Sequence, residues 1–166
     1  MNGGIEEGMA QNIKQLQHAP IGVFDSGVGG LTVAREIMRQ IPNEKIVYFG
    51  DTARLPYGSK SKDTITRYSR QIVRFLETQD VKAIVVACNT ASAYALDSLE
   101  KEIQMPIIGV VKPGARVAAE VTQNGKIGVI GTEGTIGSQI YTEYIHNINP
   151  DARVIGKACP LFCPLV

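Results

Sequence analysis

The chain has 166 residues, of which 44% are hydrophobic, so it can bury the core of one ordinary domain or slightly more. Its 17 basic and 16 acidic residues leave a net charge of +1 and form no basic stripe, so we expect no nucleic-acid partner. Three cysteines are too few for a disulfide framework, no metal-type Cys/His spacing occurs, and no apolar run approaches membrane-spanning length. We therefore expect a cytoplasmic protein without a metal site or a membrane contact.

The first segment, residues 1–19, contains charged and amide side chains but no apolar core, which excludes a secretory signal and predicts a disordered leader. From residue 20 onward, short apolar strands alternate with amphipathic helices. This pattern is typical of an α/β fold in which helices cover both faces of a parallel sheet, giving three α/β/α layers. Strands are predicted at residues 21–24, 45–49, 83–87, 107–110, 127–130 and 153–157.

A helix is predicted over residues 61–79, where apolar side chains recur at helical spacing and arginines occupy another, solvated face. The apolar positions are Ile65, Tyr68, Ile72, Phe75 and Leu76, and the arginines are Arg67, Arg70 and Arg74. A second helix is expected directly after the strand that ends at residue 87.

A junction between two domains is predicted at residues 112–114, because Lys-Pro-Gly is expected to break regular structure. This divides the chain into a first α/β domain at residues 20–111 and a second at residues 112–166. The second ends in an uncharged, apolar tail at residues 159–166 for which no helix is predicted. We interpret the chain as a fragment of a longer protein; the alternative is a complete chain whose tail packs into its own core or a partner's.

Polar residues follow four of the predicted strands, at residues 25–30, 51–59, 88–90 and 131–135. In open α/β sheets, ligands bind beyond the carboxyl ends of the strands. One such end is explained by helix capping, for which Ser, Thr, Asp and Asn are preferred. Four ends that supply carboxylates, a thiol, an amide and hydroxyls point instead to a small polar pocket.

Cys88 is the candidate for chemistry, because it follows a buried, β-branched strand and precedes a helix. The helix N-terminus is expected to favour its thiolate. The alternative is a small buried core residue, since free cysteine is among the most buried side chains. The adjoining Asn89 and Thr90 favour the functional interpretation.

The glycines at residues 27–30 do not form a phosphate-binding loop. A dinucleotide fingerprint needs Gly at Thr32, and a Walker loop needs Lys at Val28. A tight turn into a helix explains the glycines but not Asp25 beside Ser26, where a carboxylate can accept hydrogen bonds from an ammonium group or a thiol.

A rigid loop is predicted at residues 56–58, where Pro-Tyr-Gly allows the backbone to approach a ligand closely. The N–H groups of Tyr57 and Gly58 are able to hold a carboxylate there. On its own this signal is weak, because Pro-Tyr-Gly also occurs in ordinary turns.

Together these motifs resemble bacterial glutamate racemase, over the stretch from residue 21 to the end of the chain. They are FDSGVGGLT at residues 24–32, GDTARLPYG at 50–58, ACNTAS at 87–92 and GTEGTI at 131–136. Four motifs in this order, at natural βα spacing, make the resemblance specific.

The resemblance implies a cofactor-independent racemase that interconverts L- and D-glutamate for peptidoglycan synthesis, with two thiols on opposite faces of the substrate Cα. Cys88 matches the first thiol, and Asp25 would orient it and tune its proton affinity. The remaining matched positions would bind the substrate's carboxylates and ammonium. They are Ser26, Tyr57, Gly58, Asn89, Thr90 and Thr132, beside Asp25 itself.

The chain departs from this family in one respect. Family members carry a later Cys-Thr-His segment with the second thiol, and this chain has none. Neither Cys159 nor Cys163 is followed by Thr-His, so we do not expect either to replace it. The family has two pseudo-symmetric domains and builds the first from both ends of the sequence, so here the first would lack its return segment and the second would be incomplete.

We therefore expect weak glutamate binding and slow or no racemisation by this chain alone. Two alternatives stay open. One is another amino-acid racemase of the same superfamily, acting on aspartate or hydantoin. The other is a non-catalytic binding or interaction fragment, and a homodimer is compatible with either.

Overall fold

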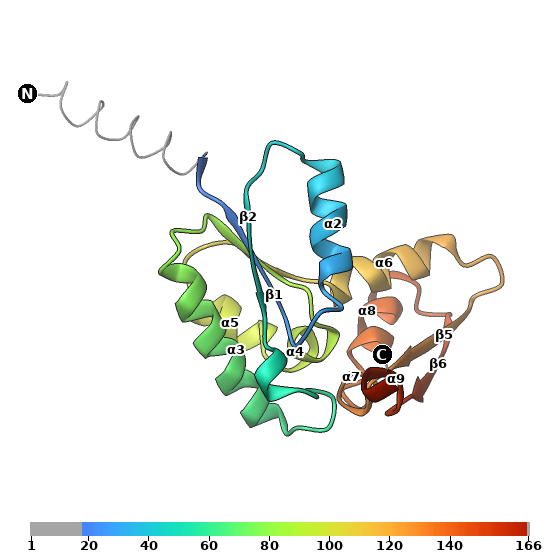
Figure 1. Cartoon of the computed structure of the whole chain (residues 1–166). Helices are drawn as coiled ribbons and strands as arrows, with labels where there is room; N and C mark the ends of the chain where they lie inside the picture. The colour runs from blue at the N-terminus through green and yellow to red at the C-terminus, as the bar shows by residue number, and fades with distance from the viewer. Residues whose placement is uncertain (1–17, 166) are drawn as a thin grey trace, which may run out of the picture.

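The computed structural model describes residues 18–165. The leader predicted at residues 1–19 lies, up to residue 17, outside the described residues. The α/β class is confirmed, because parallel strands alternate with helices along the chain (Figure 1).

The first sheet has four parallel strands in the order β2-β1-β3-β4. They span Ile21–Asp25 (β1), Ile46–Gly50 (β2), Ala83–Val86 (β3) and Ile107–Gly109 (β4). All four were predicted from the sequence to within one residue at each end. The order places β1 between β2 and β3, so the ends of these three strands lie next to one another.

Helices cover this sheet, with α2 on one side and α3 on the other (Figure 1). Their bounds are Leu31–Gln40 (α2), Lys62–Glu77 (α3), Asn89–Tyr94 (α4) and Leu96–Glu102 (α5), and a 3₁₀ turn, η1, spans Thr52–Arg54. The helix expected after Cys88 is thus present in two pieces, which meet at Ala95.

Helix α3 begins where Ser61 caps it, its hydroxyl accepting a hydrogen bond from the Thr64 N–H at 3.3 Å. Ile65, Ile72 and Leu76 are buried in the core of the first sheet, as their spacing predicted. The prediction for Phe75 was wrong: its side chain is 45% exposed, and its ring is tilted by 54° against that of Phe49, with the ring centres 5.3 Å apart. Val73 is buried instead. The buried side chains of α3 form a stripe that includes Val73 and leaves Phe75 outside it.

The second sheet has two parallel strands, β5 at Lys126–Gly131 and β6 at Arg153–Ala158. Both were predicted. Helices α6 (Val111–Val121), α7 (Glu133–Gly137), α8 (Ile140–Ile148) and α9 (Phe162–Leu165) accompany it. A separate, smaller hydrophobic cluster lies beneath α6 and α8, around Ala115, Ala119, Ile145 and Ala152.

Two expectations about this half of the chain were wrong. Residues 112–114 do not break regular structure but lie in the first turn of α6. Proline is compatible with a first helical turn, because the N–H groups there have no acceptor within the helix. The Gly114 N–H already donates a helical hydrogen bond to the Val110 carbonyl at 3.2 Å. The apolar tail also forms a short helix, α9, in which Leu165 N–H reaches the Leu161 carbonyl at 3.1 Å.

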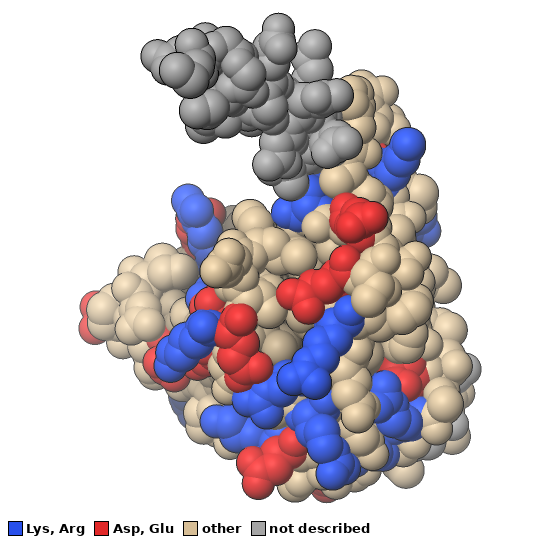
Figure 2. Space-filling model, turned by 90° about the vertical axis from the view of Figure 1, so that its left-hand side faces the viewer, with Lys and Arg blue, Asp and Glu red and all other residues tan. Residues whose placement is uncertain are grey.

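The face over α3 and α5 carries both signs of charge. Figure 2 shows Lys and Arg side chains intermixed with Asp and Glu on it. Arg70 of α3 pairs with Glu102 at the end of α5 through a hydrogen-bonded salt bridge of 2.6 Å. The predicted arginine face is therefore partly neutralised. None of the helices within residues 18–165 has the length and apolarity that crossing a membrane requires.

Gly30 occupies a site with no room for a side chain. A Cβ atom there would lie 2.6 Å from the Asp25 Cβ and 2.9 Å from the Ala87 Cβ, both of which are anchored at strand ends. We expect Gly30→Ala to lower the free energy of unfolding by about 1–3 kcal/mol, as overpacking does. Urea unfolding followed by circular dichroism measures this loss.

Gly29→Ala is the matched control, since a Cβ at Gly29 meets only the Asp25 Oδ2 atom, at 3.7 Å. An equal loss of stability in both variants would contradict the packing argument.

Candidate active site

Three candidate side chains stand at the carboxyl ends of neighbouring strands. Asp25 ends β1, Asp51 follows β2, and Cys88 follows β3 by two residues. The Asp51 N–H bonds the Asp25 carbonyl at 2.9 Å, and the Ala87 N–H bonds the Phe24 carbonyl at 2.8 Å. The strand order thus brings the predicted polar ends of the first sheet together.

Asp25 is 6% exposed, and its carboxylate is held by the backbone of the loop that follows. Its Oδ2 atom accepts hydrogen bonds from the Gly27 N–H at 3.1 Å and the Gly30 N–H at 3.0 Å. Amide donors of this kind compensate a carboxylate for the water it loses on burial. The glycines therefore serve the carboxylate rather than a phosphate.

Cys88 is 5% exposed and is the N-cap residue of α4. Its Sγ atom accepts a hydrogen bond from the Ala91 N–H at 3.5 Å. The Ala91 N–H at the helix N-terminus lowers the pKa of the thiol, as expected, but it does not set the direction of the net shift. Burial and the charge of Asp25 raise the pKa of the Cys88 thiol, and hydrogen bonds from Ser26 and Ala91 only partly oppose them.

Tyr57 is 2% exposed and packs into the core of the first sheet. Its hydroxyl donates a hydrogen bond to the Asp51 Oδ2 atom, and Arg54 Nε donates to Asp51 Oδ1 at 2.9 Å. Burial and the bond to Asp51 raise the pKa of Tyr57. The Arg54 guanidinium also lies 4.3 Å from the centre of the Tyr68 ring. This network fixes the loop that carries Gly58.

The N–H groups of Tyr57 and Gly58 donate to no other residue within the described part of the chain. No described residue competes for these two donors, and their binding of a carboxylate stays a prediction. The Gly58 carbonyl accepts a hydrogen bond from the Gly134 N–H at 3.0 Å. A Cβ at Gly58 would lie 2.5 Å from the Thr132 Cβ, so the loop touches the start of α7 directly.

Threonine hydroxyls link the two sheets at the site. Thr90 Oγ1 lies 2.8 Å from Thr132 Oγ1, which lies 3.0 Å from Thr135 Oγ1. Thr132 also caps α7 by accepting the Thr135 N–H at 3.2 Å. Asn89 is exposed, and its Oδ1 atom accepts a hydrogen bond from the Tyr141 hydroxyl of α8 at 2.7 Å.

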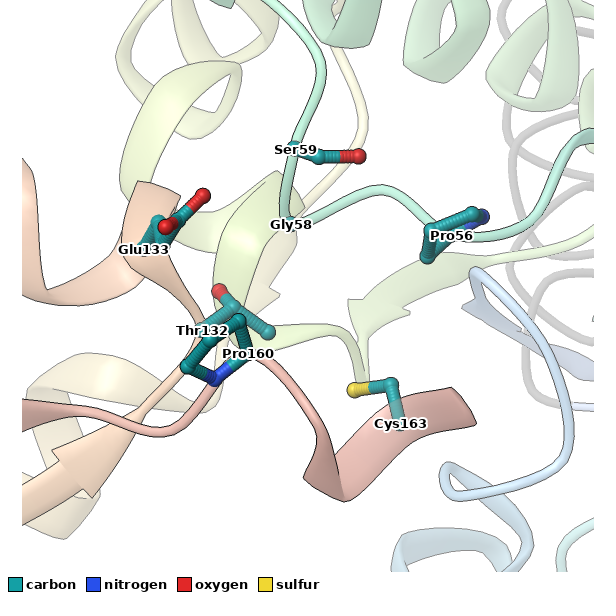
Figure 3. A pocket seen from close by; sticks show the side chains of 7 residues that line it. All are labelled: Pro56, Gly58, Ser59, Thr132, Glu133, Pro160 and Cys163. Atoms are coloured by element: carbon teal, nitrogen blue, oxygen red, sulfur yellow. The ribbon is translucent and has the colours of Figure 1, made fainter. Parts of the chain in front are cut away.

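A cavity lies between the Pro56 loop, the start of α7 and α9 (Figure 3). Gly58 and Thr132, both predicted to bind substrate, line it together with Cys163 of α9. A neighbouring groove is lined by Asn89 and Thr132 with Cys159 and Cys163. Within residues 18–165, no three His, Cys, Asp or Glu side chains gather as metal ligands would.

Sequence reasoning missed four residues of this site. Tyr48 on β2 donates a hydrogen bond to the Gly27 carbonyl, Thr135 joins the hydroxyl cluster, Tyr141 bonds Asn89, and Arg54 pairs with Asp51. Thr135 and Arg54 lie inside motifs that the sequence singled out. Tyr48 and Tyr141 lie inside a strand and a helix, where an aromatic residue indicates only core packing.

Comparison with known proteins extends these observations. Residues 21–160 match the family model of the Asp/Glu/Hydantoin racemases. A glutamate racemase of Geobacter metallireducens is 59% identical over 145 residues, which cover 87% of this chain and 54% of that protein. One of Streptococcus pneumoniae is 52% identical over 151 residues, covering 91% of this chain and 57% of that protein.

Solved structures of glutamate racemases are also similar to this chain. A glutamate racemase isoform of Bacillus anthracis superposes with a TM-score of 0.87 at 50% identity, over 90% of this chain and 56% of that one. The Francisella tularensis glutamate racemase in complex with D-glutamate gives 0.82 at 44% identity, over 89% and 55%. The chain thus spans about half the length of the relatives it matches. It belongs to the Asp/Glu/Hydantoin racemase family.

Proposed function

We propose that this chain provides the Cys88 half of a cofactor-independent racemase site for glutamate, which supplies D-glutamate for peptidoglycan in the cytoplasm. The observation that carries the proposal is the meeting of Asp25, Ser26 and Cys88 at the adjacent ends of β1 and β3. The names of the relatives support glutamate as the substrate.

Cys88 is proposed to transfer the α-proton. The Cα–H of an amino acid is a very weak acid, so the base that removes it must hold a proton strongly. Burial and Asp25 raise the pKa of the Cys88 thiol, which makes its thiolate a stronger base. A substrate ammonium entering beside Asp25 would offset that carboxylate's charge and favour formation of the thiolate when substrate is present.

The substrate carboxylates are proposed to bind donors on the far side of the site. The N–H groups of Tyr57 and Gly58, the hydroxyls of Thr90 and Thr132 and the amide of Asn89 surround this region from three separate segments. Donors aimed at a carboxylate also stabilise the charge that moves onto it as the α-proton leaves.

Racemisation also requires a proton donor on the opposite face of Cα, and the chain contains no Cys-Thr-His sequence. We therefore propose that the chain alone catalyses exchange slowly or not at all, and that ligand binding is the more informative measurement.

Glutamate should protect Cys88 from alkylation. The tryptic peptide 83–101 contains Cys88 as its only cysteine, so mass spectrometry follows this thiol separately from Cys159 and Cys163. We expect glutamate to slow iodoacetamide modification of Cys88, and aspartate and hydantoin to do so less.

Thr132→Val should raise the glutamate concentration needed for half-maximal protection by roughly tenfold, because it removes a hydrogen bond to a charged group. Thr122→Val, at the end of α6, is the matched control. Absence of protection by glutamate would count against glutamate as the ligand, and stronger protection by aspartate or hydantoin would favour those substrates.

Whatever α-proton exchange the chain catalyses should depend on Cys88. In deuterated water, we expect Cys88→Ser to reduce loss of the glutamate α-proton signal, measured by NMR, to background, since acid–base groups contribute roughly 10²–10⁴-fold. Cys159→Ser is the control. Exchange that survives in Cys88→Ser and disappears in Cys159→Ser would refute the assignment.

Asp25→Asn should shift the pH dependence of Cys88 alkylation to lower pH. The Asp25 charge raises the pKa of the thiol, so a neutral amide lowers it and increases the thiolate fraction at neutral pH. A downward shift of half a unit to one unit speeds alkylation at pH 7 by about three- to tenfold. Asp63→Asn, at the exposed start of α3, should leave the profile unchanged.

A further inference from the structure

Tyr48 is a residue of the site that no proposed step yet uses. It lies on β2 in register with Val23 of β1, and its hydroxyl donates a hydrogen bond to the Gly27 carbonyl at 3.1 Å. The Gly27 carbonyl approaches β2 so closely that a Cβ at Gly50 would lie 2.4 Å from its oxygen. Gly50 therefore leaves the space that this contact occupies.

Gly27 is held at both of its polar backbone atoms. Its N–H donates to Asp25 Oδ2 at 3.1 Å, while its carbonyl accepts from Tyr48. Because Gly27 directly follows Ser26, the two bonds restrict the backbone on which Ser26 stands. The pairing of Phe24 with Val86, and the bond from the Ala87 N–H to the Phe24 carbonyl, bring the ends of β1 and β3 together, and there hydrogen bonding by Ser26 lowers the pKa of the Cys88 thiol.

We propose that Tyr48 is a positioning residue for Cys88: its hydroxyl holds the Gly27 carbonyl, and thereby keeps Ser26 in hydrogen-bonding position on the thiol. A role in glutamate proton transfer rests on the proposed function, but the contacts and the test below do not. The chain of contacts crosses from β2 through the loop after β1 to the start of α4.

Three titratable groups interact with the Cys88 thiol: the Asp25 charge raises its pKa, and the Cys88 charge in turn raises the pKa values of Tyr48 on β2 and Tyr57 in the loop after η1. Burial, Asp25 and Cys88 raise the pKa of Tyr48 to about 12, and the pKa of Tyr57 is raised as well. Both hydroxyls are therefore uncharged over the range in which the thiol is assayed. Replacing Tyr48 by Phe thus removes a hydrogen bond but no charge.

The test is the pH dependence of Cys88 alkylation by iodoacetamide in the whole chain, followed on peptide 83–101 in the absence of glutamate. Ser26 hydrogen bonds lower the pKa of the thiol, so loosening them raises it. We expect Tyr48→Phe to move the midpoint of this pH profile upward by about half a pH unit and to slow alkylation at neutral pH by about threefold.

Tyr144→Phe is the matched control, because Tyr144 lies on α8 and its hydroxyl interacts with Lys112 rather than with this loop. Its midpoint should equal that of the unmodified chain. A rate increase at every pH with an unchanged midpoint in Tyr48→Phe would mean that the variant only opens access to the thiol, and would overturn the proposal. So would an equal midpoint shift in Tyr144→Phe.

Ser26→Ala provides a second variant on the same path. Alone it should raise the midpoint of the pH profile, and Tyr48→Phe should add less to it in this variant than in the unmodified chain, because only the Ser26 backbone bond is left for the Tyr48 hydroxyl to act on. Fully additive shifts would refute this path. If Tyr48→Phe abolishes the cooperative thermal transition, the hydroxyl supports the fold as a whole and the proposal also fails.

These outcomes are independent of substrate identity. Absence of glutamate protection in the unmodified chain, together with a midpoint shift in Tyr48→Phe, would count against the proposed substrate and leave the positioning role standing. Protection by glutamate with no midpoint shift would do the reverse.

Discussion

The site depends on the burial of one carboxylate, that of Asp25, at the end of the central strand β1. A buried carboxylate is stable only if hydrogen bonds replace the water it loses, and here the Gly27 and Gly30 N–H groups supply them. The loop must therefore turn back over the strand end, which is why Gly30 has no room for a Cβ. The same turn directs Ser26 to the thiol of the neighbouring strand.

This constraint sets the electrostatics of Cys88. A thiol at a helix N-terminus is usually favoured as the thiolate, but α4 has only six residues, and Cys88 is buried beside the Asp25 charge. The desolvation and the neighbouring negative charge outweigh the hydrogen-bond donors, so the pKa of the thiol is raised. A cationic group that enters next to Asp25 would offset that carboxylate's charge, the second cause after burial, and so couple formation of the thiolate to the presence of a ligand.

The sequence was sufficient to predict all six strands, because short apolar runs separated by polar turns have few other interpretations in an α/β chain. It also predicted that Asp25 and Cys88 stand at strand ends. It could not predict the partners of these residues. Tyr48 reaches the site through the pairing register of β2 with β1, and Tyr141 through the position of α8 beside Asn89. The sequence pattern of one chain reveals neither the strand register nor the helix position. The Lys-Pro-Gly prediction failed because proline is compatible with a first helical turn.

The contact between the two sheets follows from the same loop geometry. Asp51 fixes Arg54 and Tyr57, and this places the Gly58 carbonyl on the Gly134 N–H and Gly58 itself against Thr132. Thr132 Oγ1 accepts the Thr135 N–H that caps α7, lies within hydrogen-bonding distance of the Thr90 hydroxyl, and lines the cavity with Gly58. A hydroxyl donates only one proton, so when a ligand accepts it, the Thr90 hydroxyl must be the donor in its bond with Thr132. Ligand binding at Thr132 is therefore coupled to the hydrogen bonds that join the two sheets.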